Sequence, residues 1–327
     1  MRLGVSLAVA AVLVVVLARW GGVGVGEVRE ALGRLTWGVY AAALGLHVAI
    51  YVLRAARMQV LLGRAVTSGF GKQLGVCLAH GMASIVLPAK VGELAYVVYA
   101  GRVLGVRAET GLAVVVVARV LDLAVLMLGM GVACVVAGGA GSVEWMRPVG
   151  AVALVGALGL FAVTWHGEWL VKVGVWASRK VRIGRSKVGA RVIERVEGVG
   201  SALAEAARGG RLWGAIAVSV AAWVCVFGFC AVLAEGLGIE GLGLGEVVFG
   251  SGVAMLTSLV PVSAFASVGT LEAGWVVGFG VFGVGRELAL ATGAGLHVVQ
   301  LVNVVGLGVV GHVVMALSAK GGERKGG

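Results

Sequence analysis

Apolar residues occur along this chain in long runs separated by short polar stretches. The runs lack the alternation of polar and apolar positions that strands of a membrane barrel require. They are typical of helices that cross a membrane, which need about 20 mainly apolar residues. We therefore predict an all-α, polytopic transmembrane helical bundle. The predicted runs are 3–18, 37–53, 73–100, 111–137, 149–165, 212–235, 246–285 and 288–317.

Two of these runs are interrupted at corresponding places in the two halves of the chain. Each interruption contains a proline, then a glycine, then a glutamate: Pro88, Gly92 and Glu93 in the first, and Pro261, Gly269 and Glu272 in the second. Proline ends a helix, and broken backbone at membrane depth occurs where it is buried in protein or lines a wet cavity. Matched interruptions predict two re-entrant hairpins, arranged as inverted repeats around a transport site. The competing interpretation is that they are chance kinks in a glycine-rich chain.

Composition agrees with a membrane protein. Hydrophobic residues make up 60% of the 327 residues and charged residues 13%, whereas soluble domains carry about 25% charged residues. The 57 glycines permit close approach of helices. The four cysteines lie within apolar runs and lack C-x-x-C spacing, so neither a disulfide framework nor a metal site is expected. The sequence also lacks the P-loop, H-E-x-x-H and G-x-S-x-G motifs, and we expect no cofactor and no enzymatic activity.

The net charge of +11 comes from basic residues that lie mostly between the apolar runs. This distribution follows the positive-inside rule and the attraction of anionic headgroups, and it does not indicate nucleic-acid binding. If the N-terminus is inside and each broken run enters and leaves by the same side, most of the 27 Lys and Arg residues lie on the inner side. We predict a multi-pass protein of the inner (plasma) membrane, with the N-terminus, the 166–211 loop and the C-terminus in the cytoplasm.

A single integral membrane domain, residues 1–327, accounts for the whole pattern. Its first run, 3–18, is interpreted as an uncleaved helix, with a signal peptide as the alternative. The main polar segment carries five apolar residues at helical spacing beside a basic stripe, which predicts an amphipathic helix over 178–208 on the inner membrane surface. The parts are half 1 (37–165), the amphipathic linker (166–211), half 2 (212–317) and a basic tail (318–327).

Charged residues inside the runs are the candidates for chemistry. Asp122 is the only aspartate, and Arg119 precedes it by three residues, so both lie on one face of a helix. Each charge at the centre of a membrane helix costs about 2.5–3.5 kcal/mol, so the pair is either a structural clasp or a functional site. Lys90, Glu93 and Glu272 have no partner at helical spacing. A weaker polar stripe lies on the last run, and its histidine is expected to make an interhelical hydrogen bond: His297, Gln300 and Asn303.

Five short motifs follow one another between residues 40 and 317: Arg54-Ala55-Ala56-Arg57, Leu87-Pro88-Ala89-Lys90-Val91-Gly92-Glu93, Ala118-Arg119-Val120-Leu121-Asp122, Leu259-Val260-Pro261 and Gly269-Thr270-Leu271-Glu272. This order resembles the lysylphosphatidylglycerol synthase transmembrane-region family, which includes the flippase domain of the multiple peptide resistance factor and stand-alone flippase-like proteins. The resemblance implies an integral inner-membrane protein with two re-entrant hairpins and a role in lipid translocation.

The chain departs from the family pattern at several points. Ala118 stands where the family commonly has glutamate before the arginine, and Ala264, Phe265 and Ala266 replace part of a glycine-rich turn. His297 occupies the place of a frequent arginine in the last helix. The soluble aminoacyl-transfer domain of the full-length synthase is not seen in these 327 residues, so we do not expect lysyl transfer to lipid.

Our leading hypothesis is a lipid flippase or transporter that moves an anionic phospholipid or a polyprenyl-phosphate-linked lipid between leaflets. The half-helix N-termini and the basic residues would attract the headgroup, and the acidic residues would balance their charge or exchange protons. The alternative is a non-transporting subunit that positions a glycosyltransferase or another lipid-modifying enzyme. The candidate substrate-binding residues are Lys90, Glu93, Arg119, Asp122, Glu272, Arg54 and Arg57.

Overall fold

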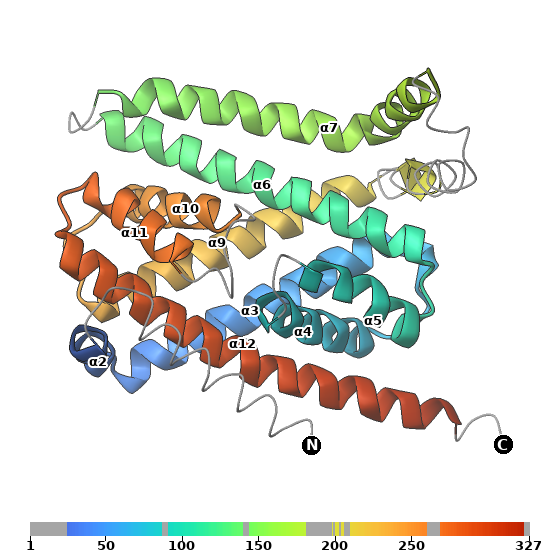
Figure 1. Ribbon diagram of the computed structural model, residues 1–327, viewed down its shortest axis with the longest axis horizontal. Helices are drawn as coiled ribbons and strands as arrows, with labels where there is room; N and C mark the ends of the chain where they lie inside the picture. Colours follow the sequence, from blue (N-terminus) through green and yellow to red (C-terminus); the bar gives the residue numbers. More distant parts are fainter. Residues whose placement is uncertain are drawn as a thin grey trace.

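The computed structural model describes residues 25–86, 91–139, 144–180, 198, 200–202, 204–205, 210–259 and 269–323. Throughout this part of the chain the regular structure is helical (Figure 1). The main helices are α2 (Val25–Gly33), α3 (Trp37–Leu62), α4 (Phe70–Val86), α5 (Ala95–Leu104), α6 (Ala108–Gly139), α7 (Met146–Lys180), α9 (Arg211–Leu237), α10 (Leu244–Leu259), α11 (Thr270–Gly280) and α12 (Arg286–Glu323).

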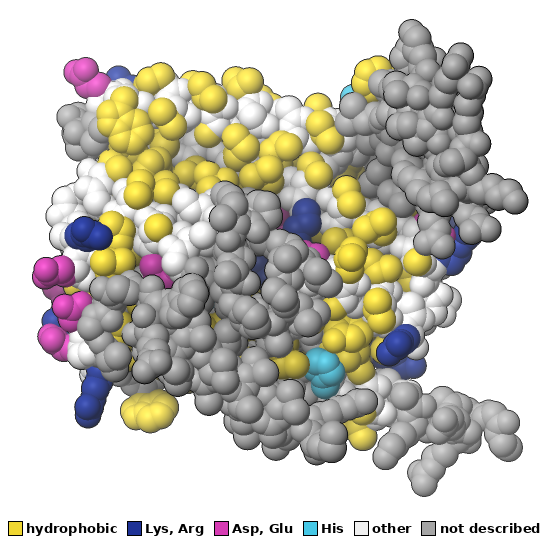
Figure 2. Space-filling model, in the orientation of Figure 1, with side chains coloured by type: hydrophobic (Ala, Val, Ile, Leu, Met, Phe, Trp, Pro, Cys, Tyr) yellow, Lys and Arg dark blue, Asp and Glu magenta, His cyan; other side chains and the backbone are white. Residues whose placement is uncertain are grey.

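Five of the helices in the described residues are long and apolar enough to cross a membrane, and they lie in α3, α6, α7, α9 and α12. This confirms the predicted all-α transmembrane class. Figure 2 shows hydrophobic side chains spread over the face that α6 and α7 form, and the exposed residues of α7 include Val152, Val155 and Leu158. An outward-facing apolar surface of this kind is suited to lipid.

The predicted run 37–53 ends too early. The helix continues to Leu62, and Met58, Leu61 and Leu62 are buried. The run is interrupted by Arg54 and Arg57, which lie within the helix and do not mark its end. The helix ends instead at Gly63, whose φ of 51° is a left-handed conformation that glycine adopts readily.

Each broken run forms a pair of short helices. In the first, α4 ends at Val86 and a short 3-10 helix, η2 (Val91–Leu94), leads into α5. In the second, α10 ends at Leu259 and α11 begins at Thr270. Figure 1 shows the α10–α11 pair and the α4–α5 pair toward opposite ends of the molecule. Their re-entrant path through a membrane and the inverted repeat remain predictions.

Several sequence predictions fall on residues outside the described part of the chain. These are the first run, 3–18, both prolines of the broken runs, Lys90, and most of the amphipathic helix over 178–208. The expected linker begins differently, because α7 continues as one helix from Met146 to Lys180. Residues 166–180 are therefore part of the helix that contains the third candidate span.

Close glycine contacts bring the second helix pair together. A Cβ atom on Gly278 of α11 would lie 2.8 Å from the Cα of Gly250 on α10 and would also meet the carbonyl oxygen of Gly250. Real Cβ atoms do not approach backbone this closely, so the two helices touch through their main chains. A Cβ atom on Gly280, at the end of the same helix, would meet nothing within 4 Å.

We expect Gly278→Ala to destabilise the protein by about 1–3 kcal/mol, because an added methyl group must push α11 away from the backbone of α10. Gly280→Ala is the matched control and should leave stability nearly unchanged. Thermal unfolding of the detergent-solubilised protein measures both. Equal unfolding temperatures for the two variants would contradict the close backbone contact.

Candidate functional site

A cavity of about 200 Å³ lies between six helices, α3, α4, α6, α9, α10 and α12. Its apolar lining includes Ile50, Val115 and Phe229. Its polar lining is dominated by nitrogen-bearing side chains, namely Arg54, Arg57, Arg119, His47, His80 and Gln300. Because the helices around it include four of the five candidate spans, this polar cavity is enclosed by membrane-type helices.

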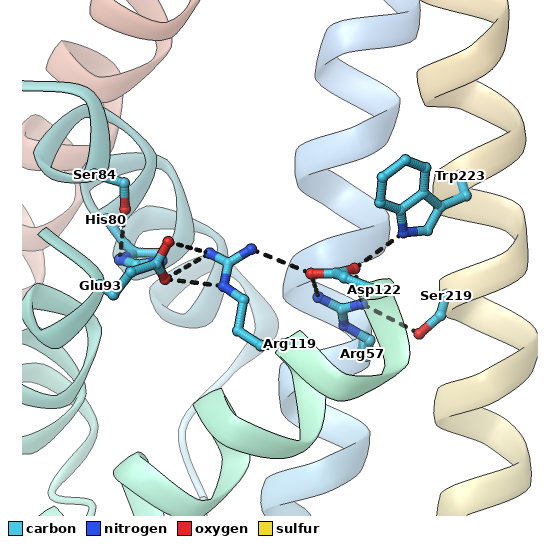
Figure 3. Close-up of polar contacts among 8 residues, drawn as sticks. All are labelled: Arg57, His80, Ser84, Glu93, Arg119, Asp122, Ser219 and Trp223. Carbon is cyan, nitrogen blue, oxygen red and sulfur yellow. Dashed lines mark hydrogen bonds and ion pairs between the residues drawn. The ribbon is translucent and has the colours of Figure 1, made fainter. Parts of the chain in front are cut away.

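The most deeply buried ion pair of the cavity joins α3 to α6. Arg57 donates from Nη1 to Oδ1 of Asp122 at 2.6 Å and from Nη2 to Oδ2 at 3.2 Å. Arg57 also donates to Oγ of Ser219 on α9 at 3.2 Å, and Trp223 of α9 donates from Nε1 to Oδ1 of Asp122 at 3.2 Å. Arg57 is 4% exposed and Asp122 is 8% exposed. Four hydrogen bonds satisfy this carboxylate, the fourth coming from Arg119 on α6 (Figure 3).

Arg119 lies between two carboxylates. It donates to both oxygens of Glu93, at 2.8 Å to Oε1 and 2.6 Å to Oε2, and to Oδ2 of Asp122 at 3.2 Å. Its side chain is 43% exposed, in contrast to Arg57. Glu93 lies in η2, directly after the first break, so this contact ties the broken segment to α6.

A short polar chain continues from Glu93 into α4. Nε2 of His80 lies 3.7 Å from Oε2 of Glu93, and Nδ1 of His80 lies 3.4 Å from Oγ of Ser84. His80 and Ser84 line the cavity. Figure 3 shows these side chains on the opposite side of Arg119 from the Arg57–Asp122 pair.

Arg54 adds a third guanidinium to the cavity. Its Cζ lies 6.0 Å from the ring centroid of Tyr51, a cation–π distance. Within the described residues no carboxylate lies within ion-pair distance of Arg54. Among the described residues, three guanidinium groups line the cavity, and the carboxylates of Asp122 and Glu93 pair with two of them, so the charge balance is positive.

The seven predicted site residues are distributed over two places and one undescribed position. Arg54, Arg57, Arg119, Asp122 and Glu93 lie together at the cavity. Lys90 lies outside the described residues. Glu272 lies elsewhere, paired with the last helix.

Glu272 forms a separate buried pair with His297. Oε1 of Glu272 lies 2.7 Å from Nδ1 of His297, and the two side chains are 3% and 2% exposed. Its other oxygen accepts a hydrogen bond from the backbone N–H of Gly269, the N-cap residue of α11, at 2.7 Å. The sequence shows no partner for Glu272 at helical spacing, and it predicts that the half-helix N-terminus attracts a headgroup. At α11 the protein's own carboxylate occupies that position.

Glycine is required at the two breaks for different structural reasons. Gly269 has a φ of 85°, a conformation that other residues adopt only with strain. At Gly92 a Cβ atom would lie 2.6 Å from the carbonyl carbon of Ala83. Gly269 permits a turn, and Gly92 permits close packing against α4.

Sequence reasoning missed the partners contributed by α9 and α4. Trp223 and Ser219 lie four residues apart inside an apolar run, where both residue types are ordinary. Their spacing places them on one helical face, which is the signal that could have identified them. Among the described residues, no group of three or more His, Cys, Asp or Glu side chains is arranged to hold a metal ion.

The fold and the site define a class: a polytopic helical membrane protein with a positively charged, ion-paired cavity between its helices. Residues 3–308 match the family model described as the lysylphosphatidylglycerol synthase TM region. The chain belongs to this family, which confirms the resemblance carried by its motifs. Comparisons with curated proteins and with solved structures each give no match.

We expect Asp122→Asn to destabilise the protein by about 3–5 kcal/mol, because it leaves the buried guanidinium of Arg57 without a counter-charge. The double variant Arg57→Met with Asp122→Leu should recover much of this loss, since it removes both charges together. Thermal unfolding in detergent and the yield of monodisperse protein report the two effects. If Asp122→Asn unfolds at the wild-type temperature, the pair does not hold α3 and α6 together.

Proposed function

We propose that this protein moves an anionic lipid, a phospholipid or a polyprenyl-phosphate-linked lipid, between the leaflets of the plasma membrane. The observation that carries the proposal is the positive balance of the cavity, in which Arg54 has no carboxylate partner among the described residues. Guanidinium groups bind phosphate through paired N–H donors, and they do so most strongly away from water. An anionic headgroup would complete the charge balance of the cavity.

Arg119 is the side chain best suited to receive the headgroup. It is 43% exposed, whereas Arg57 is buried and its two Nη atoms are bonded to Asp122 and Ser219. A phosphate group that replaces Glu93 on Arg119 would free a carboxylate next to His80. Arg119 would thereby exchange one anionic partner for another and keep a counter-charge throughout.

In this proposal the protein is a carrier and not an enzyme, and its partners are membrane lipids. Both termini lie in the cytoplasm, as the distribution of basic residues predicts. The lipid tails remain in the bilayer beside the exposed apolar side chains of helices such as α7. Only the headgroup needs the polar environment of the cavity.

We expect the purified protein in phosphatidylcholine vesicles to move acyl-chain-labelled phosphatidylglycerol faster than labelled phosphatidylcholine. Arg119→Ala and Glu93→Gln should each slow this movement about tenfold or more, because each removes one member of a charge pair in the cavity. Quenching of the label by a membrane-impermeant reagent measures the rate.

Arg102→Ala is the matched control, because Arg102 is an exposed arginine of α5 that does not line the cavity. Size-exclusion profiles and unfolding temperatures show whether the variants are folded. Wild-type rates in folded Arg119→Ala and Glu93→Gln protein would refute the site. No movement of any lipid by the wild type would instead favour a subunit that positions a lipid-modifying enzyme.

A further inference from the structure

One face of α3 has a row of polar side chains that extends beyond the cavity. Tyr40, His47, Tyr51 and Arg54 follow one another at separations of seven, four and three residues, which places them on one side of the helix. At a rise of 1.5 Å per residue, the row is about 21 Å long. This is more than half the thickness of the hydrocarbon core of a membrane, about 30 Å.

The cavity reaches only part of this row. His47, Tyr51 and Arg54 line it, whereas Tyr40 does not. Beyond the cavity, Tyr40 lies near the start of α3, where Trp37 is 86% exposed and packs edge-on to the Tyr40 ring. Exposed tryptophan and tyrosine side chains gather at the membrane–water interface. The row therefore leads from the arginines toward one end of the membrane-spanning part of the protein.

A hydrogen-bonded link closes the row just past the cavity. Asn303 of α12 donates from Nδ2 to Nδ1 of His47 at 3.3 Å, and Tyr40 donates its hydroxyl to Oδ1 of Asn303 at 3.0 Å. Asn303 and His47 are 3% and 6% exposed. The link joins α3 to α12 through neutral side chains.

The chemistry of this link suits opening and closing. Hydrogen bonds between membrane helices are individually weak, so breaking the link costs far less than separating Arg57 from Asp122. Its hydroxyl, amide and imidazole groups all donate hydrogen bonds, and none of the side chains in the row is a carboxylate. A phosphate group passing here would find donors and no repelling charge.

We propose that Tyr40, His47 and Asn303 form a second polar station on the lipid path. A phosphate-bearing headgroup that leaves the arginines for the Trp37 end of α3 displaces the Asn303 link and takes over its donors. The inference rests on the proposed function and names the side chains through which the same cavity releases its cargo. The competing explanation is that Asn303 clamps two helices and has no part in transport.

The test compares two variants of the link with a third variant, which removes a buried hydrogen bond elsewhere on α12. Asn303→Leu removes both bonds of the link, and Tyr40→Phe removes one hydroxyl while keeping the ring. Thr292→Val is the matched control, since Trp275 donates to the Thr292 hydroxyl at 3.2 Å and neither residue lines the cavity. For each full-length protein, two quantities are measured: movement of acyl-chain-labelled phosphatidylglycerol in vesicles, and phosphatidylglycerol binding in detergent by native mass spectrometry.

We expect Asn303→Leu to move the lipid about tenfold more slowly and Tyr40→Phe to show a smaller loss, as for removed hydrogen-bond donors. Binding should stay within about twofold of wild type, because the arginines are intact. Thr292→Val should transport normally.

Wild-type transport by folded Tyr40→Phe and Asn303→Leu would overturn the second station and leave the proposed function standing. Parallel loss of binding, transport and thermal stability in Asn303→Leu, with normal transport in Tyr40→Phe, would also overturn it and identify a clamp. If Asn303→Leu does not fold, Tyr40→Phe decides alone. A wild-type protein that binds and moves no lipid would instead remove the proposed function, and this inference with it.

Discussion

The arrangement of the site depends on the hydrogen bonds that the carboxylate of Asp122 accepts. A charged side chain among membrane helices is costly, and four hydrogen bonds offset this cost for Asp122. The donors are Arg57, Arg119 and Trp223, which come from α3, α6 and α9. Three helices are thus fixed relative to one another by one buried group. Because Arg119 also holds Glu93, the same network reaches the segment after the first break.

The two breaks look alike in sequence and differ in chemistry. Glu93 pairs with Arg119, a partly exposed arginine at the cavity, and in the proposed function an anionic headgroup takes the place of Glu93. Glu272 is bonded to His297 and to the backbone N–H of Gly269, which precedes α11. The side chains of Glu272 and His297 are each 3% exposed or less. In the proposed function Glu93 responds to a ligand, whereas Glu272 fixes the start of α11 against α12. A matched pattern of proline, glycine and glutamate does not imply a matched role.

Hydropathy predicted the helices because a chain that crosses a membrane must satisfy its own backbone hydrogen bonds, and a helix does so within one segment. The same reasoning ends the predicted run 37–53 too early, because two arginines, Arg54 and Arg57, interrupt the apolar pattern. The burial of Arg57 depends on Asp122, a partner 65 residues away in sequence. Such a contact is set by how helices pack, and one sequence shows only the local spacing of Arg119 and Asp122. Ser219 and Trp223 were missed for the same reason.

The contacts of α3 divide into strong and weak, and this division has a consequence for a carrier. Near its C-terminal end, Arg57 is locked by two charge-assisted bonds and gives the cavity a fixed shape. Nearer its N-terminal end, the bond from Asn303 to His47 is neutral and longer. A binding site must keep its geometry while the protein opens beside it. If all the helices separated as rigid bodies, the Arg57–Asp122 pair would have to break as well. Motion limited to the crossing of α3 and α12 would break only the weak link, so in the proposed carrier this crossing is where the protein opens.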